Sequence, residues 1–156
     1  MKIIFLDIDG VLNSATYDRT RDWTKQTDID VSRLPLLKRI VDETGAKIVL
    51  SSTWRTHWNA DGEKCDEDGK YINSTFEDFG LEVYDKTPDH GLFGERAEEI
   101  AEWLENNEDI EAFVIIDDSP FGWNELSEYT VKTNPFRGLG LEEEGVKRAI
   151  EILTTE

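Results

Sequence analysis

Short apolar runs alternate along the chain with stretches in which apolar residues recur every three or four positions. Apolar runs are typical of strands buried on both faces, and they occupy residues 3–6, 47–50 and 112–116. Shorter strands are predicted near residues 81–84 and 129–133, and a short helix is predicted within residues 75–84. Helical spacing predicts helices over residues 32–44, 94–104 and 142–153. Strands that alternate with helices predict a Rossmann-like α/β fold, in which a parallel sheet carries helices on both faces.

Two segments lack this periodicity. Residues 14–30 are polar and are expected to form a long loop, and residues 57–74 are expected to form an irregular, polar excursion. The sequence shows no repeat or domain linker, so we predict a single domain over residues 1–156, with excursions near 14–31 and 56–92. Phe121 and Trp123, which follow the 112–116 strand, are expected to lie in the core.

Composition narrows the classes of function. A formal net charge of -18 argues against binding of nucleic acid through a broad basic surface, although it does not exclude a small basic patch at one site. One cysteine excludes an internal disulfide, and two histidines with one cysteine do not make a typical zinc site. The N-terminal apolar run is too short for a secretory signal and ends in acidic residues. We therefore expect a cytoplasmic protein with no membrane partner.

The first strand ends in two closely spaced carboxylates. Asp7 and Asp9 lie two residues apart, so an extended backbone would point both side chains to the same side, and Gly10 then permits a sharp turn. Two such carboxylates repel each other unless a cation neutralises them, and Mg²⁺ is a cation that prefers hard oxygen ligands. An ordinary Asp-Gly turn after a strand is the alternative at this point.

Polar residues also follow the other buried strands. Ser51 and Ser52 come directly after the 47–50 strand, where hydroxyls and backbone N–H groups suit a phosphate oxygen, although a plain helix N-cap would use the same residues. Asp117 and Asp118 end the 112–116 strand, where burial penalises carboxylates unless something compensates. Ligands of parallel α/β sheets bind at the carboxyl ends of the strands, and these side chains are predicted to meet there.

A basic residue stands where a helix dipole disfavours it. Arg96 is in the first turn of the 94–104 helix, so a nearby anion would explain its position. The alternative is a surface arginine paired with Glu95 or Glu99.

Taken in order, Asp7-x-Asp9, Ser51, Arg96 and Asp117-Asp118 resemble the motifs of the haloacid dehalogenase (HAD) superfamily of phosphohydrolases, over nearly the whole chain. More narrowly, Leu-Asp-Ile-Asp-Gly-Val-Leu-Asn, Leu-Ser-Ser-Thr-Trp-Arg and Ile-Ile-Asp-Asp are similar to the HAD domain of Swiss Army Knife RNA repair proteins. The resemblance implies a HAD-type parallel sheet. The excursions near residues 14–31 and 56–92 leave room for a loop or mini-cap and are too short for the large cap domain that many HAD enzymes carry.

The resemblance also implies a role for each motif. Asp7 would be the nucleophile that forms an aspartyl-phosphate, and Asp9 would protonate the leaving group and later activate water. Mg²⁺ would be held by Asp7, Asp9 through its backbone carbonyl, and Asp117, with Asp118 in support. Ser51 or Ser52 would bind the phosphoryl group. The basic residue would be Arg96, with Lys86 as the alternative, and Arg55 is a possible substrate contact, as in polynucleotide-end phosphatases of the superfamily.

The expected activity is that of a Mg²⁺-dependent phosphatase. Its partner would be a phosphorylated substrate, either a small molecule such as a nucleotide or a nucleic-acid end. Trp23, Trp54 and Trp58 could stack on bases, whereas the net acidity weighs against a polynucleotide. The alternatives are a non-catalytic HAD-like module that binds phosphate and a phosphotransferase that uses an acceptor other than water.

Overall fold

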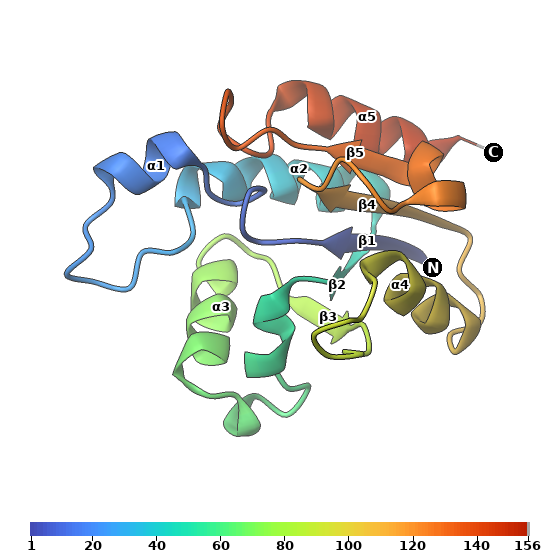
Figure 1. Cartoon of the computed structure of the whole chain (residues 1–156), viewed down its shortest axis with the longest axis horizontal. Coiled ribbons are helices and arrows are strands. Elements are labelled where there is room, and N and C mark those ends of the chain that lie inside the picture. Colours follow the sequence, from blue (N-terminus) through green and yellow to red (C-terminus); the bar gives the residue numbers. More distant parts are fainter. Residues whose placement is uncertain (156) are drawn as a thin grey trace.

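A computed structural model describes residues 1–155 of the chain. Its centre is a parallel sheet of five strands in the order β3-β2-β1-β4-β5 (Figure 1). The strands are β1 (Lys2–Leu6), β2 (Lys47–Leu50), β3 (Val83–Lys86), β4 (Ala112–Asp117) and β5 (Thr130–Lys132). The first strand of the sequence is therefore the central strand of the sheet. The predicted Rossmann-like α/β fold is confirmed.

Helices cover both faces of the sheet (Figure 1). One face packs against α2 (Leu34–Thr44), α3 (Glu67–Glu77) and α5 (Glu143–Thr154). The other packs against α4 (Arg96–Glu105) and the 3-10 helix η4 (Asn124–Tyr129). Further short elements are α1 (Ala15–Thr20) and the 3-10 turns η1 (Val31–Arg33), η2 (Thr53–His57) and η3 (Gly62–Lys64).

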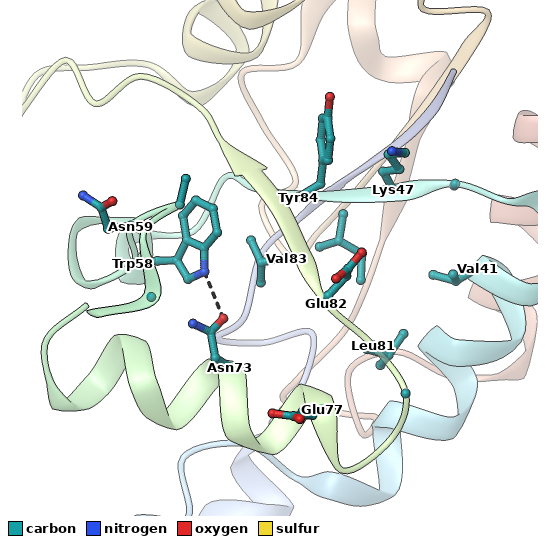
Figure 2. A pocket seen from close by; sticks show the side chains of 15 residues that line it. Val41, Lys47, Trp58, Asn59, Asn73, Glu77, Leu81, Glu82, Val83 and Tyr84 are labelled. Carbon is teal, nitrogen blue, oxygen red and sulfur yellow. Dashed lines mark hydrogen bonds between the residues drawn. The ribbon is translucent and has the colours of Figure 1, made fainter. Parts of the chain in front are cut away.

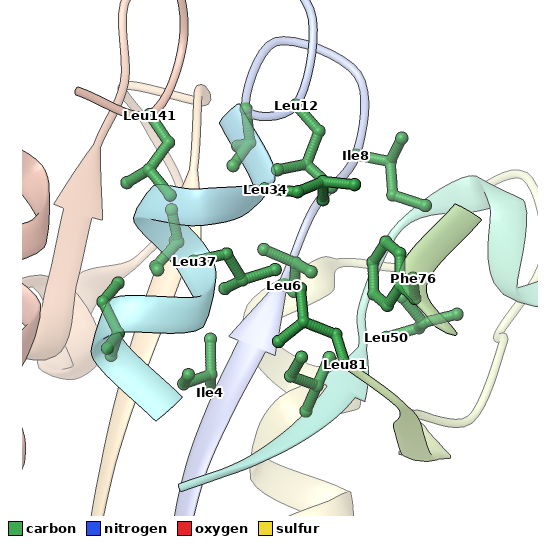
Figure 3. Packing of buried hydrophobic residues seen from close by; sticks show 14 of the residues in the cluster. Ile4, Leu6, Ile8, Leu12, Leu34, Leu37, Leu50, Phe76, Leu81 and Leu141 are labelled. Carbon is green, nitrogen blue, oxygen red and sulfur yellow. The ribbon is translucent and has the colours of Figure 1, made fainter. Parts of the chain in front are cut away.

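The alternation of side chains along β1 divides the core into two layers. Leu6 packs against Leu34 and Leu37 of α2, as Figure 3 shows. Phe5 points to the opposite face, where its ring meets Trp103 of α4 edge to face, with the ring centroids 5.4 Å apart. Both layers exclude water from the central strand, and this burial supplies the main driving force for the fold.

Two of the segment predictions were wrong. The segment expected to be a loop contains α1, whose N-cap is Ser14, and the segment expected to be irregular contains the start of α3. Asp66 caps α3 by accepting a hydrogen bond from the Gly69 backbone N–H. The apolar spacing of α3 is hard to recognise because Gly69 and Thr75 occupy buried positions on its inner face. Strand β3 also begins two residues later than the predicted 81–84.

The excursions hold no large cap. They consist of α1 with the loop that follows it, the turns η2 and η3, α3, β3 and the loop before α4. In Figure 1, α1 and the loop after it extend beyond the carboxyl end of β1. Of the two aromatic residues expected in the core, Trp123 is buried, but Phe121 is 82% exposed, so that part of the prediction was wrong. Within residues 1–155 no helix has the length and apolar character needed to cross a bilayer.

Candidate active site

Three of the predicted site residues emerge from the sheet at the same level. The backbone N–H of Asp7 donates to Ile116, and that of Ser51 donates to Leu6. Asp7, Ser51 and Asp117 each lie two residues after a side chain packed in the α4 layer, namely Phe5, Val49 and Ile115.

Because side chains two residues apart share a face, the sheet brings these three groups to its α4 side, at the carboxyl ends of neighbouring strands.

The carboxylates of Asp7, Asp117 and Asp118 form one cluster, with oxygen atoms from each within 4.8 Å of one another. Arg96, the first residue of α4, contacts two of them: its Nη1 lies 2.6 Å from an Asp117 oxygen and 3.2 Å from an Asp7 oxygen. A single guanidinium therefore faces three carboxylates. The alternative for Arg96, a surface pair with Glu95 or Glu99, does not describe these contacts.

This imbalance of charge changes the protonation of Asp7. Burial, reinforced by the neighbouring Asp117 carboxylate, raises the pKa of Asp7 to about 7, although Arg96 acts in the opposite direction. Burial and Asp117 also raise the pKa of Asp118. In the absence of another cation, Asp7 and Asp118 thus hold their protons more tightly than ordinary aspartates do.

The turn after β1 is shaped to admit Asp118. Gly10 has a φ of +86°, and a Cβ atom at this position would stand 2.3 Å from an Asp118 carboxylate oxygen. Any other residue would be strained and would also displace that carboxylate. The Gly10 carbonyl accepts a hydrogen bond from Thr133 at the end of β5, which anchors the turn. Gly10 is therefore part of the carboxylate cluster's architecture.

The two adjacent serines differ in their partners. Ser52 caps η2, because its hydroxyl accepts from the Trp54 backbone N–H at 3.1 Å. Ser51 is fully buried, and its hydroxyl has no hydrogen-bond partner. A buried hydroxyl without a partner costs free energy, and such groups in folded proteins call for an explanation, such as a ligand. The sequence alone left both serines open; the structure gives Ser52 a capping role and leaves the Ser51 hydroxyl without a partner.

The expected pairing of the Asp7 and Asp9 carboxylates is wrong, because the Asp9 carboxylate points away from the cluster that contains Asp7. One of its carboxylate oxygens accepts from the side-chain amide of Asn13 at 3.0 Å, and the other accepts from the indole N–H of Trp54 at 3.1 Å. Its side chain is exposed, unlike the buried Asp7. The sequence indicated Trp54 only as a residue that could stack on a base. It did not predict that Trp54 and Asn13 hydrogen-bond to Asp9, because nothing in the local sequence signals these contacts.

Arg55 lies in a buried contact of its own. Its Nη1 donates to the backbone carbonyls of Ser51 and Ser52, and its Nη2 donates to Glu99 of α4 at 2.9 Å. Arg55 and Glu99 are both buried. Glu99 also accepts from the His90 backbone N–H at 2.8 Å. The pair joins the loop after β2 to α4 and to the loop before it, a connection that the sequence did not predict.

Lys86, the alternative basic residue, has other contacts. Its ammonium group donates to the backbone carbonyls of Arg55 at 3.1 Å and Trp58 at 2.7 Å, so it braces the η2 turn. Trp58 is buried and hydrogen-bonded to Asn73, and it lines a cavity of about 590 Å³ between β3 and α3 (Figure 2). Trp58, one of the three predicted stacking residues, is therefore turned into this cavity, and none of the predicted catalytic, phosphate-binding or metal-binding residues lines it.

The donor set fits a divalent cation. Three aspartates offer carboxylate oxygens at one point, and such hard oxygen ligands suit Mg²⁺. One arginine contacts this group of three carboxylates, so the cluster carries an excess of negative charge when its aspartates are ionised. A cation would neutralise this excess.

Comparison with known proteins gives one match. The sequence model described as the HAD domain in Swiss Army Knife RNA repair proteins matches residues 3–144 of the 156. The matched region begins in β1 and ends in the first turn of α5, so it contains every predicted site residue. No curated protein and no solved structure matches the chain.

Proposed function

The chain belongs to the family of HAD domains in Swiss Army Knife RNA repair proteins, and from this we propose that it is a Mg²⁺-dependent phosphatase acting on phosphate monoesters through an aspartyl-phosphate. Membership of the HAD family implies a phosphohydrolase-type function, and HAD domains typically use a divalent metal. The observation that carries the finer proposal is the charge imbalance at the sheet edge, where three carboxylates face one arginine beside a serine hydroxyl without a partner.

In the proposed reaction, a carboxylate oxygen of Asp7 attacks phosphorus, and the bond between phosphorus and the leaving oxygen breaks. For the proton transfer, the Asp9 side chain must turn from its hydrogen bonds with Asn13 and Trp54 toward the leaving oxygen. Asp9 then gives its proton to that oxygen, so the leaving group departs as an alcohol. Water then attacks the aspartyl-phosphate, Asp9 takes up a proton from it, and inorganic phosphate leaves with Asp7 restored. Asp7 must be ionised to attack, which a pKa of about 7 makes dependent on the positive charge nearby.

In the proposal, the residues around Asp7 position the phosphoryl group and neutralise its negative charge. Arg96 would balance charge on the phosphoryl oxygens, and the Ser51 hydroxyl would donate to one of them. The contact of Arg96 with Asp7 and the lack of a partner for the Ser51 hydroxyl support these roles. A Mg²⁺ ion would be held by Asp7, Asp117 and the backbone carbonyl of Asp9, with Asp118 in support. When bound, it would reduce the repulsion between the carboxylates and an incoming phosphate dianion.

The proposed substrate is the phosphate monoester of a small molecule, such as a nucleotide, or of a nucleic-acid end. Without a large cap, the loops between strands and helices form the rim of the site, and the exposed Trp23 lies in one of them.

A metal titration tests the proposal. Inorganic phosphate release from an aryl phosphate is measured at rising Mg²⁺ concentration and then with EDTA in excess of the metal. We expect turnover that saturates with Mg²⁺ and is abolished by EDTA. A module that only binds phosphate would retain it without turnover, and a phosphotransferase would pass it to an added alcohol in preference to water. Either result would contradict the proposal.

A further inference from the structure

We propose that a groove between the loop before α4 and the loop after β4 binds the organic part of the substrate, and that it selects a flat, uncharged leaving group about the size of one nucleoside. This inference rests on the proposed function, because it assigns the place of the group to which the phosphate is bonded. It goes further in naming a substrate class and the residues that choose it.

The groove is continuous with the reaction centre. It has a volume of about 800 Å³, and Arg96, Thr53 and Ser119 are among its lining residues. Arg96 also contacts Asp7 and Asp117. Thr53 follows Ser51 by two residues, and Ser119 follows Asp117 by two. A phosphate ester bound at the carboxylates therefore has this groove beside it, and the volume lies in the range of small-molecule sites.

Apolar side chains are presented along the groove. Leu92 and Phe121 line it from opposite loops, and they are 93% and 82% exposed. Trp123 and Ala97 complete its apolar lining. Exposed large apolar side chains that gather at a pocket indicate a binding surface, and an aromatic ring such as Phe121 offers a face on which a flat ring can stack.

The exposure of Phe121 is built into its loop. The Ser119 hydroxyl donates to the backbone carbonyl of Phe121 at 3.1 Å, and the Trp123 indole donates to the carbonyl of Ser119 at 2.9 Å. The Ser119 backbone N–H donates to Asp117, which ties this loop to the carboxylate cluster. Gly122 has a φ of +86° and lets the chain reverse between Phe121 and the buried Trp123. The ring is therefore held outward beside the site.

The charged side chains that line the groove favour a leaving group without further negative charge. Its ionisable lining residues are two arginines and three acidic residues: Arg55, Arg96, Asp89, Glu95 and Glu99. The two arginines contact Glu99 and Asp89, and Asp7 and Asp117, respectively. Among the described residues that line the groove, no cation is left for a second phosphate. A leaving group with further phosphates would meet uncompensated negative charge there, whereas a neutral ring would not.

Selectivity between esters tests the groove. The value of kcat/KM is measured for a nucleoside monophosphate, for glycerol phosphate, which has no ring, and for a nucleoside bisphosphate, in the wild type, Phe121→Ala and Phe136→Ala. Phe136 is a matched control, because it is 81% exposed and lies in the loop after β5, outside the groove.

We expect the monophosphate to be preferred over both other esters. In Phe121→Ala its advantage over glycerol phosphate should fall about tenfold, which corresponds to about 1.4 kcal/mol, within the range for stacking of one base on one aromatic ring. In Phe136→Ala the ratio should not change. A ratio is used because general damage to the enzyme would lower both values together.

The inference and the proposed function can fail separately. If phosphate is released but Phe121→Ala keeps the wild-type ratio, or if the bisphosphate or a 3′-phosphorylated oligonucleotide is preferred over the monophosphate, the groove inference is overturned and the phosphatase stands. If no ester is turned over, the phosphatase fails, and binding of the monophosphate is measured through tryptophan fluorescence. Weaker binding to Phe121→Ala than to Phe136→Ala would then still support the groove, and equal binding would overturn it.

Discussion

Two groups of charged side chains meet at the first turn of α4, and they differ in balance. Arg55 and Glu99 have protein partners for their charges. The two terminal nitrogens of the arginine contact two backbone carbonyls and the carboxylates of Glu99 and Asp89, although its Nε has no partner, and the glutamate accepts from a guanidinium and a backbone N–H. In the other group, Asp7, Asp117 and Asp118 share a single arginine. A balanced group holds elements together, whereas an unbalanced one calls for a ligand.

The balanced pair supports the unbalanced cluster. The balanced pair fixes the loop after β2 against α4, and thereby holds Ser51 and Arg96 in their places. The free energy of folding can then tolerate an unbalanced cluster beside it. Substitutions can disturb one of the two charged groups while leaving the other in place.

Breaking the balanced pair should have the largest effect on stability. Glu99→Ala leaves the guanidinium of Arg55 buried without its main partner, and removal of one partner of a buried ion pair costs about 3–5 kcal/mol. Urea unfolding measures the change in the free energy of unfolding. Glu98→Ala is the matched control, because Glu98 is exposed in the same turn of α4 and should change stability by only about 0.5 kcal/mol. Equal effects of the two variants would show that the pair is not a support.

Removing the cation of the unbalanced cluster should affect activity. Arg96→Ala leaves the three carboxylates without their arginine, and loss of one group that stabilises the transition state typically lowers kcat by about 10²–10³-fold. Lys86→Met removes hydrogen bonds to two backbone carbonyls and should lower stability with little change in kcat. Steady-state kinetics decide between them. If Lys86→Met is the more damaging to kcat, then Lys86 is the basic residue of the site.

Supplying a cation should restore the balance, and more so at higher pH. The pKa of Asp7 is raised from 3.8 to about 7 in the folded protein, so its contribution to stability is fully present below about pH 4 and is lost as pH rises through 7. Mg²⁺ replaces the proton, so its stabilising effect should grow from pH 5 to pH 8.

At 100 times the dissociation constant, binding adds about 2.7 kcal/mol. At pH 8 this raises Tm by about 5–10 °C, since 1 kcal/mol corresponds to roughly 2–4 °C for a chain of this size. Thermal scans with Mg²⁺ and with EDTA at both pH values measure the difference. An equal increment at pH 5 and pH 8 would mean that Asp7 does not take part in binding the metal.

The smallest effects separate the two serines. Ser52→Ala removes the cap of η2 and should cost about 1 kcal/mol of stability. Ser51→Ala removes a buried hydroxyl that has no partner in the protein, so stability should be kept or should rise, while kcat/KM falls roughly tenfold through the loss of one hydrogen bond to a charged group. Chemical unfolding and kinetics on both variants test this. The opposite pattern would make Ser52 the phosphate ligand.

The sequence predicted the sheet well because the strands that carry it are apolar on both faces. Their ends also located Asp7, Ser51 and Asp117, because parallel strands place their carboxyl ends at one edge. Most of helix α3 escaped prediction, since glycine and threonine occupy buried positions on its inner face and dilute the apolar spacing.

The partners of charged side chains could not be predicted in the same way. Glu99 looks like any other residue of an acidic helix until the fold places Arg55 against it. The contact of Trp54 with Asp9 joins residues 45 positions apart. Phe121 follows a buried strand and was expected in the core, but Gly122 and the Ser119 hydrogen bonds turn it outward. Such contacts depend on tertiary structure, and local sequence carries no signal of them.

The most direct test of the central claim compares the wild type with Asp7→Asn. Inorganic phosphate release from an aryl phosphate is measured with Mg²⁺, together with the free energy of unfolding of each protein without metal at pH 8. We expect the variant to lose turnover while gaining stability, because asparagine removes a charge that is disfavoured by burial and repelled by Asp117 and Asp118. If Asp7→Asn keeps the wild-type rate, Asp7 is not the nucleophile and the account of the site is wrong.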